Sequence, residues 1–161
     1  MGIFNVNKFA AYISRDYLDK FHKTISPVRL QKSLYFCFAY WGGFVEKGKL
    51  QDKNKMEIDT SNYDKYLFDA TFQAWVYGPV IPAVYNNNNI DSAYDENLFN
   101  GNDYIKDFID DLLKDINDVS DFKLVDISHK DEAWINHFHY GDKYHNEEIP
   151  KDEIINEYIQ K

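Results

Sequence analysis

The chain has a single cysteine, Cys37, among its 161 residues. One cysteine cannot form an intrachain disulfide, which favours a reducing compartment. It lies in the apolar run 34–41, where a cysteine is usually a small hydrophobic side chain. That run, the longest here, is far too short to cross a bilayer. The N-terminus lacks the basic and apolar regions of a secretion signal, so we expect a cytoplasmic protein with no membrane attachment.

Positive charge is scarce: 18 Lys and Arg stand against 27 Asp and Glu, for a net charge of −9. Direct binding to a nucleic-acid backbone is therefore not expected, because it needs concentrated Lys and Arg. A basic protein partner and mimicry of nucleic acid both stay open. The excess of negative charge is concentrated in residues 91–121, which carry ten acidic side chains and two lysines.

Hydrophobic residues make up 44% of the chain and aromatic residues 17%, which argues against intrinsic disorder. At this length we expect one domain over residues 1–161, large enough to bury a substantial core. Thirteen Tyr and twelve Phe are a heavy aromatic load. Because aromatic side chains dominate both cores and interfaces, some are expected to face a partner.

Apolar residues at helical spacing predict a first helix over residues 6–21, with Asn5 or Asn7 as its cap. Its expected apolar stripe is Val6, Phe9, Ala10, Ile13, Tyr17 and Phe21. Ser26 and Pro27 are typical of a helix start, and the second helix should span residues 28–45. Residues 34–41 are apolar on every side, so this helix should be the buried centre of the fold. Gly42 and Gly43 should weaken or end it.

Beyond a polar surface stretch at 48–65, residues 68–77 alternate between apolar and polar, which predicts a half-buried strand. A lone strand is unstable, and residues 56–58 or 123–125 are its candidate partners. Further helices are expected after a cap at Asn102, over 128–138 and over 150–159. The expected fold is mainly α with a small β element (α+β), compact around the central helix.

Residues 72–85 contain no charged side chain. Pro79 should end the strand at a rigid turn, and Pro82 should open a short helix. This arrangement gathers Trp75, Tyr77 and Tyr85, which we call the aromatic corner. The corner is either a plug that closes the core or a hot spot for a partner. Trp75 falls on the polar face of the strand, which favours exposure.

His129 lies close to Asp131 and Glu132, a combination that occurs in acid–base catalysis. The simpler interpretation is a helix start, with Ser128 and Asp131 as a capping box. No nucleophile with an evident base and no glycine-rich phosphate loop accompanies it. We therefore expect no catalytic residues.

Three histidines, His137, His139 and His145, lie close in sequence. The imidazoles of His137 and His139 should point to different sides, and no cysteine completes a known ligand spacing. We expect no metal. On the helix after Asn102, the acidic face that includes Asp107, Asp111 and Asp115 is either a solvated surface or a guide for a basic partner.

Three segments together resemble the Panacea domain, the SocA-like antitoxin family of bacteria and their prophages. They are Leu-Gln-Lys-Ser-Leu-Tyr-Phe at 30–36, Phe-Gln-Ala-Trp-Val-Tyr-Gly-Pro-Val at 72–80 with Pro82 and Tyr85, and Ile-Ser-His-Lys-Asp-Glu-Ala-Trp at 127–134. Their order fits across residues 8–159. The third segment departs from the family pattern, with Ser128 in place of Thr and Ala133 in place of Pro, and the stretch 49–65 is longer than usual.

The resemblance implies an antitoxin-like binding module with no enzymatic activity and no cofactor. Members of the family neutralise toxins by direct protein contact, and one branch delivers its toxin to the ClpXP protease. A protein toxin, or another protein target, is therefore the expected partner. The alternative is an acidic, phage-type inhibitor that mimics nucleic acid and blocks a nucleic-acid-binding enzyme. The expected partner-binding residues are Trp75, Tyr77, Tyr85, His129 and Trp134, with Lys32 at their edge.

Overall fold

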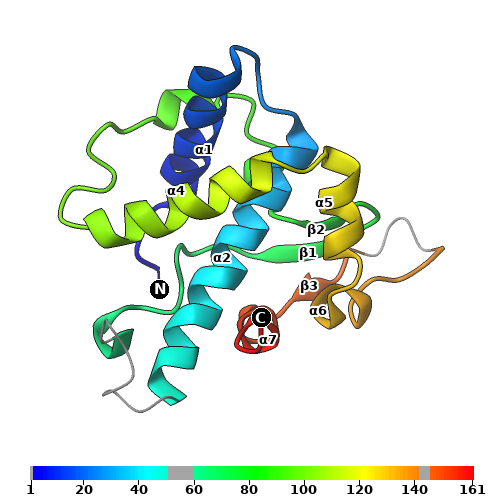
Figure 1. Ribbon diagram of the computed structural model, residues 1–161. Helices are drawn as coiled ribbons and strands as arrows, with labels where there is room; N and C mark the ends of the chain where they lie inside the picture. Colours follow the sequence, from blue (N-terminus) through cyan, green and yellow to red (C-terminus); the bar gives the residue numbers. More distant parts are fainter. Residues whose placement is uncertain (1, 51–59, 142–145) are drawn as a thin grey trace.

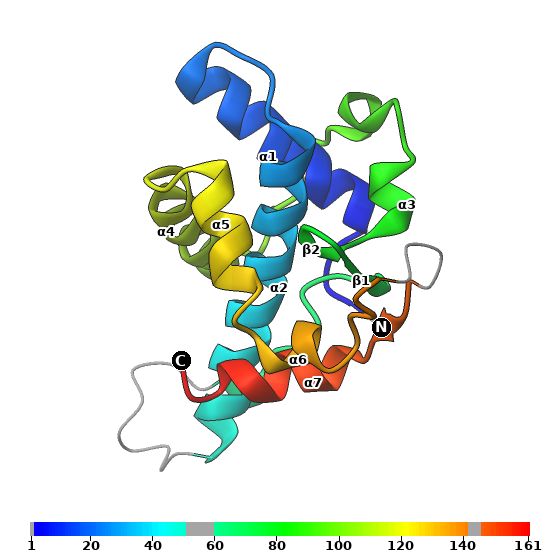
Figure 2. The ribbon, with the colours of Figure 1, turned by 90° about the vertical axis from the view of Figure 1, so that its right-hand side faces the viewer.

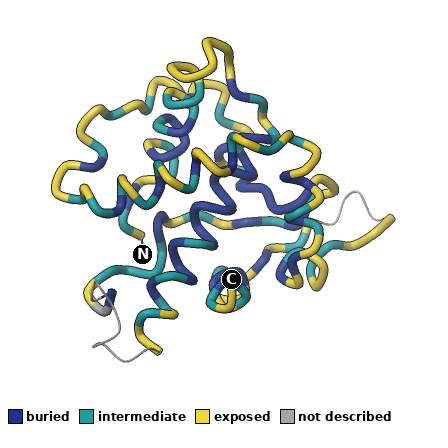
Figure 3. Tube along the Cα trace, in the orientation of Figure 1, coloured by how far each residue is buried: buried dark blue, intermediate teal, exposed yellow. Residues whose placement is uncertain are grey.

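Helix α2, Pro27–Leu50, runs through the middle of the computed structural model, which describes residues 2–50, 60–141 and 146–161 (Figure 1). Ser26 caps it, because its Oγ accepts a hydrogen bond of 3.1 Å from the Arg29 backbone N–H. Every residue from 31 to 39 is buried (Figure 3). The expected central helix is confirmed. Burial also raises the pKa of the Cys37 thiol, so this cysteine is a core side chain.

The glycine pair does not end α2, which continues unbroken to Leu50. Helix α7, Lys151–Tyr158, crosses α2 at this point. A Cβ on Gly42 would lie 2.6 Å from Ile155 Cγ1, and one on Gly43 would lie 2.5 Å from the Tyr158 carbonyl oxygen. The prediction that the pair ends α2 was wrong, and the glycines instead permit a close crossing of two helices.

The other helices surround α2, and the described residues contain seven α-helices in all. Figure 2 shows α4 and α5 on one side of α2, with the sheet and α3 on the other.

Helix α1 begins where Asn5 accepts a bond from the Lys8 N–H, as predicted, although Phe21 at its end is exposed. Asn102 precedes α4 without a side-chain capping bond. The bounds are α1 Val6–Phe21, α3 Pro82–Tyr85, α4 Asp103–Asn117, α5 Asp121–Ser128 and α6 Glu132–Ile135, with short 3₁₀ turns at Thr60–Asn62 and Ile90–Ala93.

A three-stranded antiparallel sheet has the order β2-β1-β3. Its strands are β1 Phe72–Trp75, β2 Gly78–Val80 and β3 Glu148–Ile149. Trp75 pairs with Gly78, so the turn is Val76-Tyr77, and Gly78 and Pro79 belong to the second strand. The expected rigid turn at Pro79 was wrong. Proline is tolerated here because β2 is an edge strand and needs fewer N–H donors.

Neither predicted strand partner is observed. Residues 123–125 lie in α5, and residues 56–58 are outside the described residues. The strand is also shorter than predicted, since Phe68 instead forms an isolated parallel bridge with Phe4. Residues 128–138 do not form one helix. Helix α5 ends at Ser128, and α6 begins only at Glu132.

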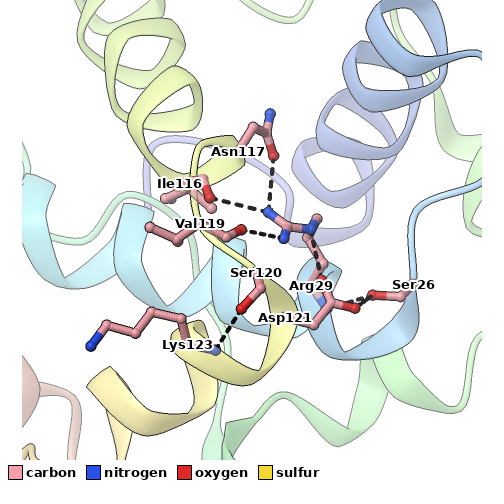
Figure 4. Close-up of polar contacts among 8 residues, drawn as sticks. All are labelled: Ser26, Arg29, Ile116, Asn117, Val119, Ser120, Asp121 and Lys123. Atoms are coloured by element: carbon pink, nitrogen blue, oxygen red, sulfur yellow. Dashed lines mark hydrogen bonds and ion pairs between the residues drawn. The ribbon is translucent and has the colours of Figure 1, made fainter.

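Arg29 joins α2 to the connection between α4 and α5 (Figure 4). This buried guanidinium bonds to Asp121 (2.8 Å), and to the carbonyl oxygens of Ile116 (3.1 Å) and Val119 (2.5 Å). It thereby satisfies carbonyl groups that the end of α4 leaves without helical partners. No helix of the described residues is long and apolar enough to span a membrane.

Candidate protein-binding site

The β1–β2 hairpin is fixed to α2 by two buried polar side chains. Gln31 accepts a bond from the Ile81 N–H (2.8 Å), and its Nε2 donates to the Ile81 carbonyl (3.3 Å). One helical position further, Lys32 Nζ donates to the Pro79 carbonyl at 2.9 Å. The backbone from Pro79 to Ile81 is therefore held in a fixed place on the central helix.

Gly78 has no room for a side chain. Its φ of +108° is a conformation that side-chain-bearing residues rarely adopt. A Cβ would lie 2.4 Å from Ser128 Oγ and 2.8 Å from Lys32 Cε. The hairpin is thus packed between the end of α5 and α2. Ser128 donates to the Val125 carbonyl (2.8 Å) and is buried against the hairpin, which overturns its expected role in a capping box.

His129 and Trp134 hold the hairpin from its other side. Trp134 Nε1 donates to the Trp75 carbonyl at 2.8 Å, and His129 Nε2 lies 2.9 Å from the Val76 carbonyl. Because a carbonyl only accepts, Nε2 must carry the proton of this bond. The two rings stack at a centroid distance of 4.2 Å. His129 therefore supports the turn through Nε2.

Asp131 faces the interior instead of capping a helix. It accepts bonds from the hydroxyls of Tyr35 and Tyr158, both at 2.5 Å, and from Lys161 Nζ at 2.8 Å. Burial and the Asp131 carboxylate raise the pKa of the Tyr35 hydroxyl. Glu157 of α7 caps α6 in its place, accepting the N–H groups of Glu132 and Ala133 at 2.9 Å each.

The aromatic corner opens onto a cavity of about 240 Å³. Trp75 and Tyr85 meet edge to face at 5.0 Å, and Trp75 Nε1 donates to Gln73 at 2.9 Å. Trp75 is half-buried, but Tyr77 is 59% and Tyr85 53% exposed, so neither tyrosine is a plug for the core. We call this space the corner cavity. Its lining residues are Pro27, Val28, Gln31, Lys32, Trp75, Val76, Tyr77, Val80 and Tyr85.

Four of the six expected binding residues line this cavity, and the other two hold the turn above it. The sequence did not indicate Val28, Gln31, Val76 or Val80 as lining residues. Gln31 could have been found, since a polar side chain on an all-apolar helix face needs a specific partner. A larger cavity of about 640 Å³ adjoins it, sharing Pro27, Gln31 and Tyr85 and continuing along residues 86–89.

Lys32 is the unusual charge of this site. It is 1% exposed, and burial alone lowers the pKa of its ammonium to about 7. Its hydrogen bond goes to a neutral carbonyl, and no carboxylate among the described residues pairs with it. Other buried charges here are compensated, as Arg29 is by Asp121 and Asp131 is by Lys161.

Helix α4, which carries the expected acidic face, lies on the other side of α2 from the sheet and α3, whose residues line part of the corner cavity (Figure 2). Asp107, Asp111 and Asp115 are all exposed at four-residue intervals on α4. Asp110 lies beside them and is engaged, accepting bonds from Tyr12 (2.5 Å) and Lys106 (2.6 Å). The stripe is solvated and continuous along the helix.

His137 and His139 do not point to different sides as expected. Both contact Glu147, His137 through Nδ1 and His139 through Nε2 at 2.9 Å, and His137 Nε2 also lies 2.7 Å from Glu153. Burial opposes a charge on His137, but the two carboxylates outweigh it and raise its pKa. His145 is outside the described residues, within which no three His, Cys, Asp or Glu side chains are placed to hold a metal ion.

The three segments that carry the family resemblance form one bonded unit. The first segment bonds to the second through Gln31 and Lys32, and the third bonds to the second through His129 and Trp134. Residues 57–135 match the family described as antitoxin SocA-like, Panacea domain. Residues 57–135 are thus similar to a Panacea domain.

The matched range contains the second and third segments in full. Helix α2 precedes the match, yet it supplies the side chains that hold the matched hairpin. No curated protein and no solved structure matches the chain. The match to this family suggests an antitoxin-like role.

Proposed function

We propose that this Panacea-like domain binds a protein toxin, or another protein target, and neutralises it by direct contact in the cytoplasm. The contact surface is the aromatic corner with Lys32 at its edge, and His129 and Trp134 position the hairpin. One observation carries the proposal. Exposed Tyr77 and Tyr85 surround a cavity on a backbone that α2, α5 and α6 hold rigid.

Rigid, partly exposed aromatics next to a preformed cavity are the groups that contribute most to protein interfaces. Their rigidity matters because a hairpin ordered only on binding would lose conformational entropy at that step. The proposal assigns no catalytic step to the domain. His129, the residue closest to a catalytic type, is bonded to the Val76 carbonyl.

The test is co-expression with a toxic reading frame adjacent to this gene. The wild-type protein should rescue growth and co-purify with the toxin, and the double substitution Tyr77→Ala, Tyr85→Ala should lose both effects while folding normally. Tyr94→Ala is the matched control, because Tyr94 is exposed, contacts Arg15 and lines neither cavity at the corner. Rescue by the double variant at wild-type strength would reject this surface.

The regular acidic stripe on α4 supports a second candidate, an inhibitor that mimics nucleic acid. Exposed carboxylates at four-residue intervals can face a basic groove, and such a contact weakens steeply with salt. Reversal of Asp107, Asp111 and Asp115 to Lys separates the two candidates. If the stripe is the contact surface, this triple variant loses activity and the tyrosine variant keeps it.

Neutralisation by proteolysis is a separate question. If the domain delivers its target to a ClpXP-type protease, the toxin's half-life should fall when the antitoxin is present and recover when the protease is deleted. If neutralisation is stoichiometric, growth rescue and toxin half-life should be the same with and without the protease.

A further inference from the structure

Lys32 is a buried cation beside a cavity that opens to solvent. An ammonium offers three N–H donors, and the Pro79 carbonyl uses one of them. Burying a charge without a counter-charge is costly, and an apolar side chain of the same length would avoid that cost. Packing alone therefore does not explain why a lysine occupies position 32.

The corner cavity combines this single cation with largely apolar walls. Pro27, Val28 and Val80 supply aliphatic surface, and Trp75 and Tyr85 supply aromatic surface. No carboxylate side chain is among the lining residues of the corner cavity. A ligand that complements such a site needs a negative charge next to an apolar stem.

We propose that the corner cavity receives an acidic side chain of the protein partner, whose carboxylate accepts a hydrogen bond from the Lys32 ammonium. The methylene groups of an inserted glutamate or aspartate would contact the apolar walls, while Tyr77 and Tyr85 pack against the surrounding partner surface. This inference rests on the proposed function, since it names the anchor by which the same surface recognises its target.

A side-chain carboxylate fits better than the C-terminal carboxylate of a peptide. Chain termini are usually captured by a group of free backbone N–H donors. Here the Ile81 N–H already donates to Gln31, and β2 is paired with β1. One lysine acts as a point charge, which suits a single carboxylate without the paired geometry that arginine would impose.

The inference predicts a characteristic pH dependence. Free Lys32 has a pKa near 7, and a bound carboxylate would raise it, so binding takes up a proton above pH 7. Affinity should fall about twofold from pH 6 to 7 and roughly thirtyfold from pH 6 to 8.5. Removing the lysine should remove this dependence.

Three small probes test the site without knowledge of the partner. They are N-acetylglutamic acid α-amide, which carries only the side-chain carboxylate, its neutral glutamine analogue, and N-acetylleucine, which carries only a terminal carboxylate. Chemical shifts of the Trp75 and Val80 amides report binding. The glutamate probe should bind the wild type about tenfold more tightly than either other probe, because its charged hydrogen bond is unavailable to them.

Lys32→Met is the decisive variant and Lys123→Met, an exposed lysine on α5, is its control. Lys32→Met should lose both the preference for glutamate over glutamine and the pH dependence, and Lys123→Met should keep both. Equal binding of the glutamate and glutamine probes, no saturable shift at the cavity, or unchanged binding to Lys32→Met would overturn the inference. A preference for N-acetylleucine would assign the site to a chain terminus instead.

These outcomes are independent of the test of function. If the tyrosine variant loses toxin rescue and the probes do not bind, the contact surface stands and the carboxylate anchor fails. If the probes bind through Lys32 and the tyrosine variant still rescues, the carboxylate site exists but is not the toxin contact.

Discussion

At the scale of single residues, the position of the hairpin depends most on Gly78. Gly78→Ala should destabilise the protein by about 2–4 kcal/mol, because alanine would be strained at φ +108° and its Cβ would overlap Ser128 and Lys32. Urea unfolding followed by circular dichroism measures this change. The Trp75 indole resonance should shift as well, since the hairpin moves.

Gly101 provides the matched control for that substitution. It also has a positive φ, +79°, but a Cβ there would meet no atom within 4 Å. Gly101→Ala should therefore cost only the backbone strain, about 1–2 kcal/mol. If the two variants lost the same stability, the close approach of Gly78 to Ser128 and Lys32 would make no contribution to the free energy of unfolding.

Lys32 should make stability depend on pH. Its pKa is near 7 when folded and close to the usual 10.5 when unfolded, so between these values the unfolded chain binds more protons and stability rises with pH. Lys32→Met should exceed the wild type by about 3–4 kcal/mol at pH 6 and by little at pH 10. Denaturation curves of both proteins across this range measure the difference, and a gap that is constant with pH would refute it.

The sequence predicted that Trp75, Tyr77 and Tyr85 lie together, but it did not predict the contacts of Ser128 and Asp131. Ser128 and Asp131 have the spacing of a capping box, and local spacing was the only available guide. Their true partners, Gly78 for Ser128 and Tyr35, Tyr158 and Lys161 for Asp131, are distant in sequence. Contacts between residues so distant in sequence cannot be predicted from one amino-acid sequence.

At the scale of elements, the crossing of α2 and α7 explains a pair of glycines inside a buried helix. Gly43→Ala should destabilise the protein by about 1–2 kcal/mol. The higher helix propensity of alanine alone would increase the free energy of unfolding by about 1 kcal/mol. The new Cβ, however, would lie 2.5 Å from the Tyr158 backbone, and this overlap outweighs the gain. Thermal unfolding gives the sign directly, and a stabilised variant would contradict the close crossing.

Gly42→Ala makes a useful comparison, because its Cβ would meet mainly the Ile155 side chain. A side chain can rotate away more readily than a backbone can move. Gly42→Ala should therefore lose less stability than Gly43→Ala.

The contacts of His137 should make the β3 region sensitive to pH. Its folded pKa is raised, so the stability that it provides is complete below the unfolded value of about 6.5 and is lost as the pH rises through the folded pKa. The stability gap between wild type and His137→Gln should therefore be larger at pH 5.5 than at pH 9. Urea unfolding at both pH values measures it, and a larger gap at pH 9 would contradict the assignment.

Most helices were predictable because periodic apolar residues specify them locally. The residues 6–21 match α1 at both ends, and the buried character of residues 34–41 identified the central helix. The strand partners were not predictable. Strand β2 has only three residues, one of them proline, and β3 has two residues 73 positions or more beyond β1, so neither has a pattern of its own.

At the scale of the whole molecule, three segments far apart in sequence meet at one surface. The resemblance to the Panacea family required all three, although only residues 57–135 match the family itself. Hydrogen bonds from α2 and from residues 129 and 134 converge on the same short hairpin. The three segments thus build one corner with exposed Tyr77 and Tyr85 side chains.

The charge distribution gives the molecule two distinct faces. Helix α4, which carries the acidic stripe, and the sheet and α3, which line part of the corner cavity, lie on opposite sides of α2 (Figure 2). A partner that uses one face therefore leaves the other available, and substitutions on the two faces should act independently.

The most direct test of the proposed function compares these faces in one binding assay. Affinity for a toxin identified by the co-expression test would be measured for wild type, for Tyr77→Ala with Tyr85→Ala, and for the triple reversal of Asp107, Asp111 and Asp115 to Lys. We predict that the tyrosine variant binds at least a hundredfold more weakly, as loss of two interface hot spots requires, and that the triple reversal changes affinity less than tenfold. The opposite ranking would contradict binding through the aromatic corner.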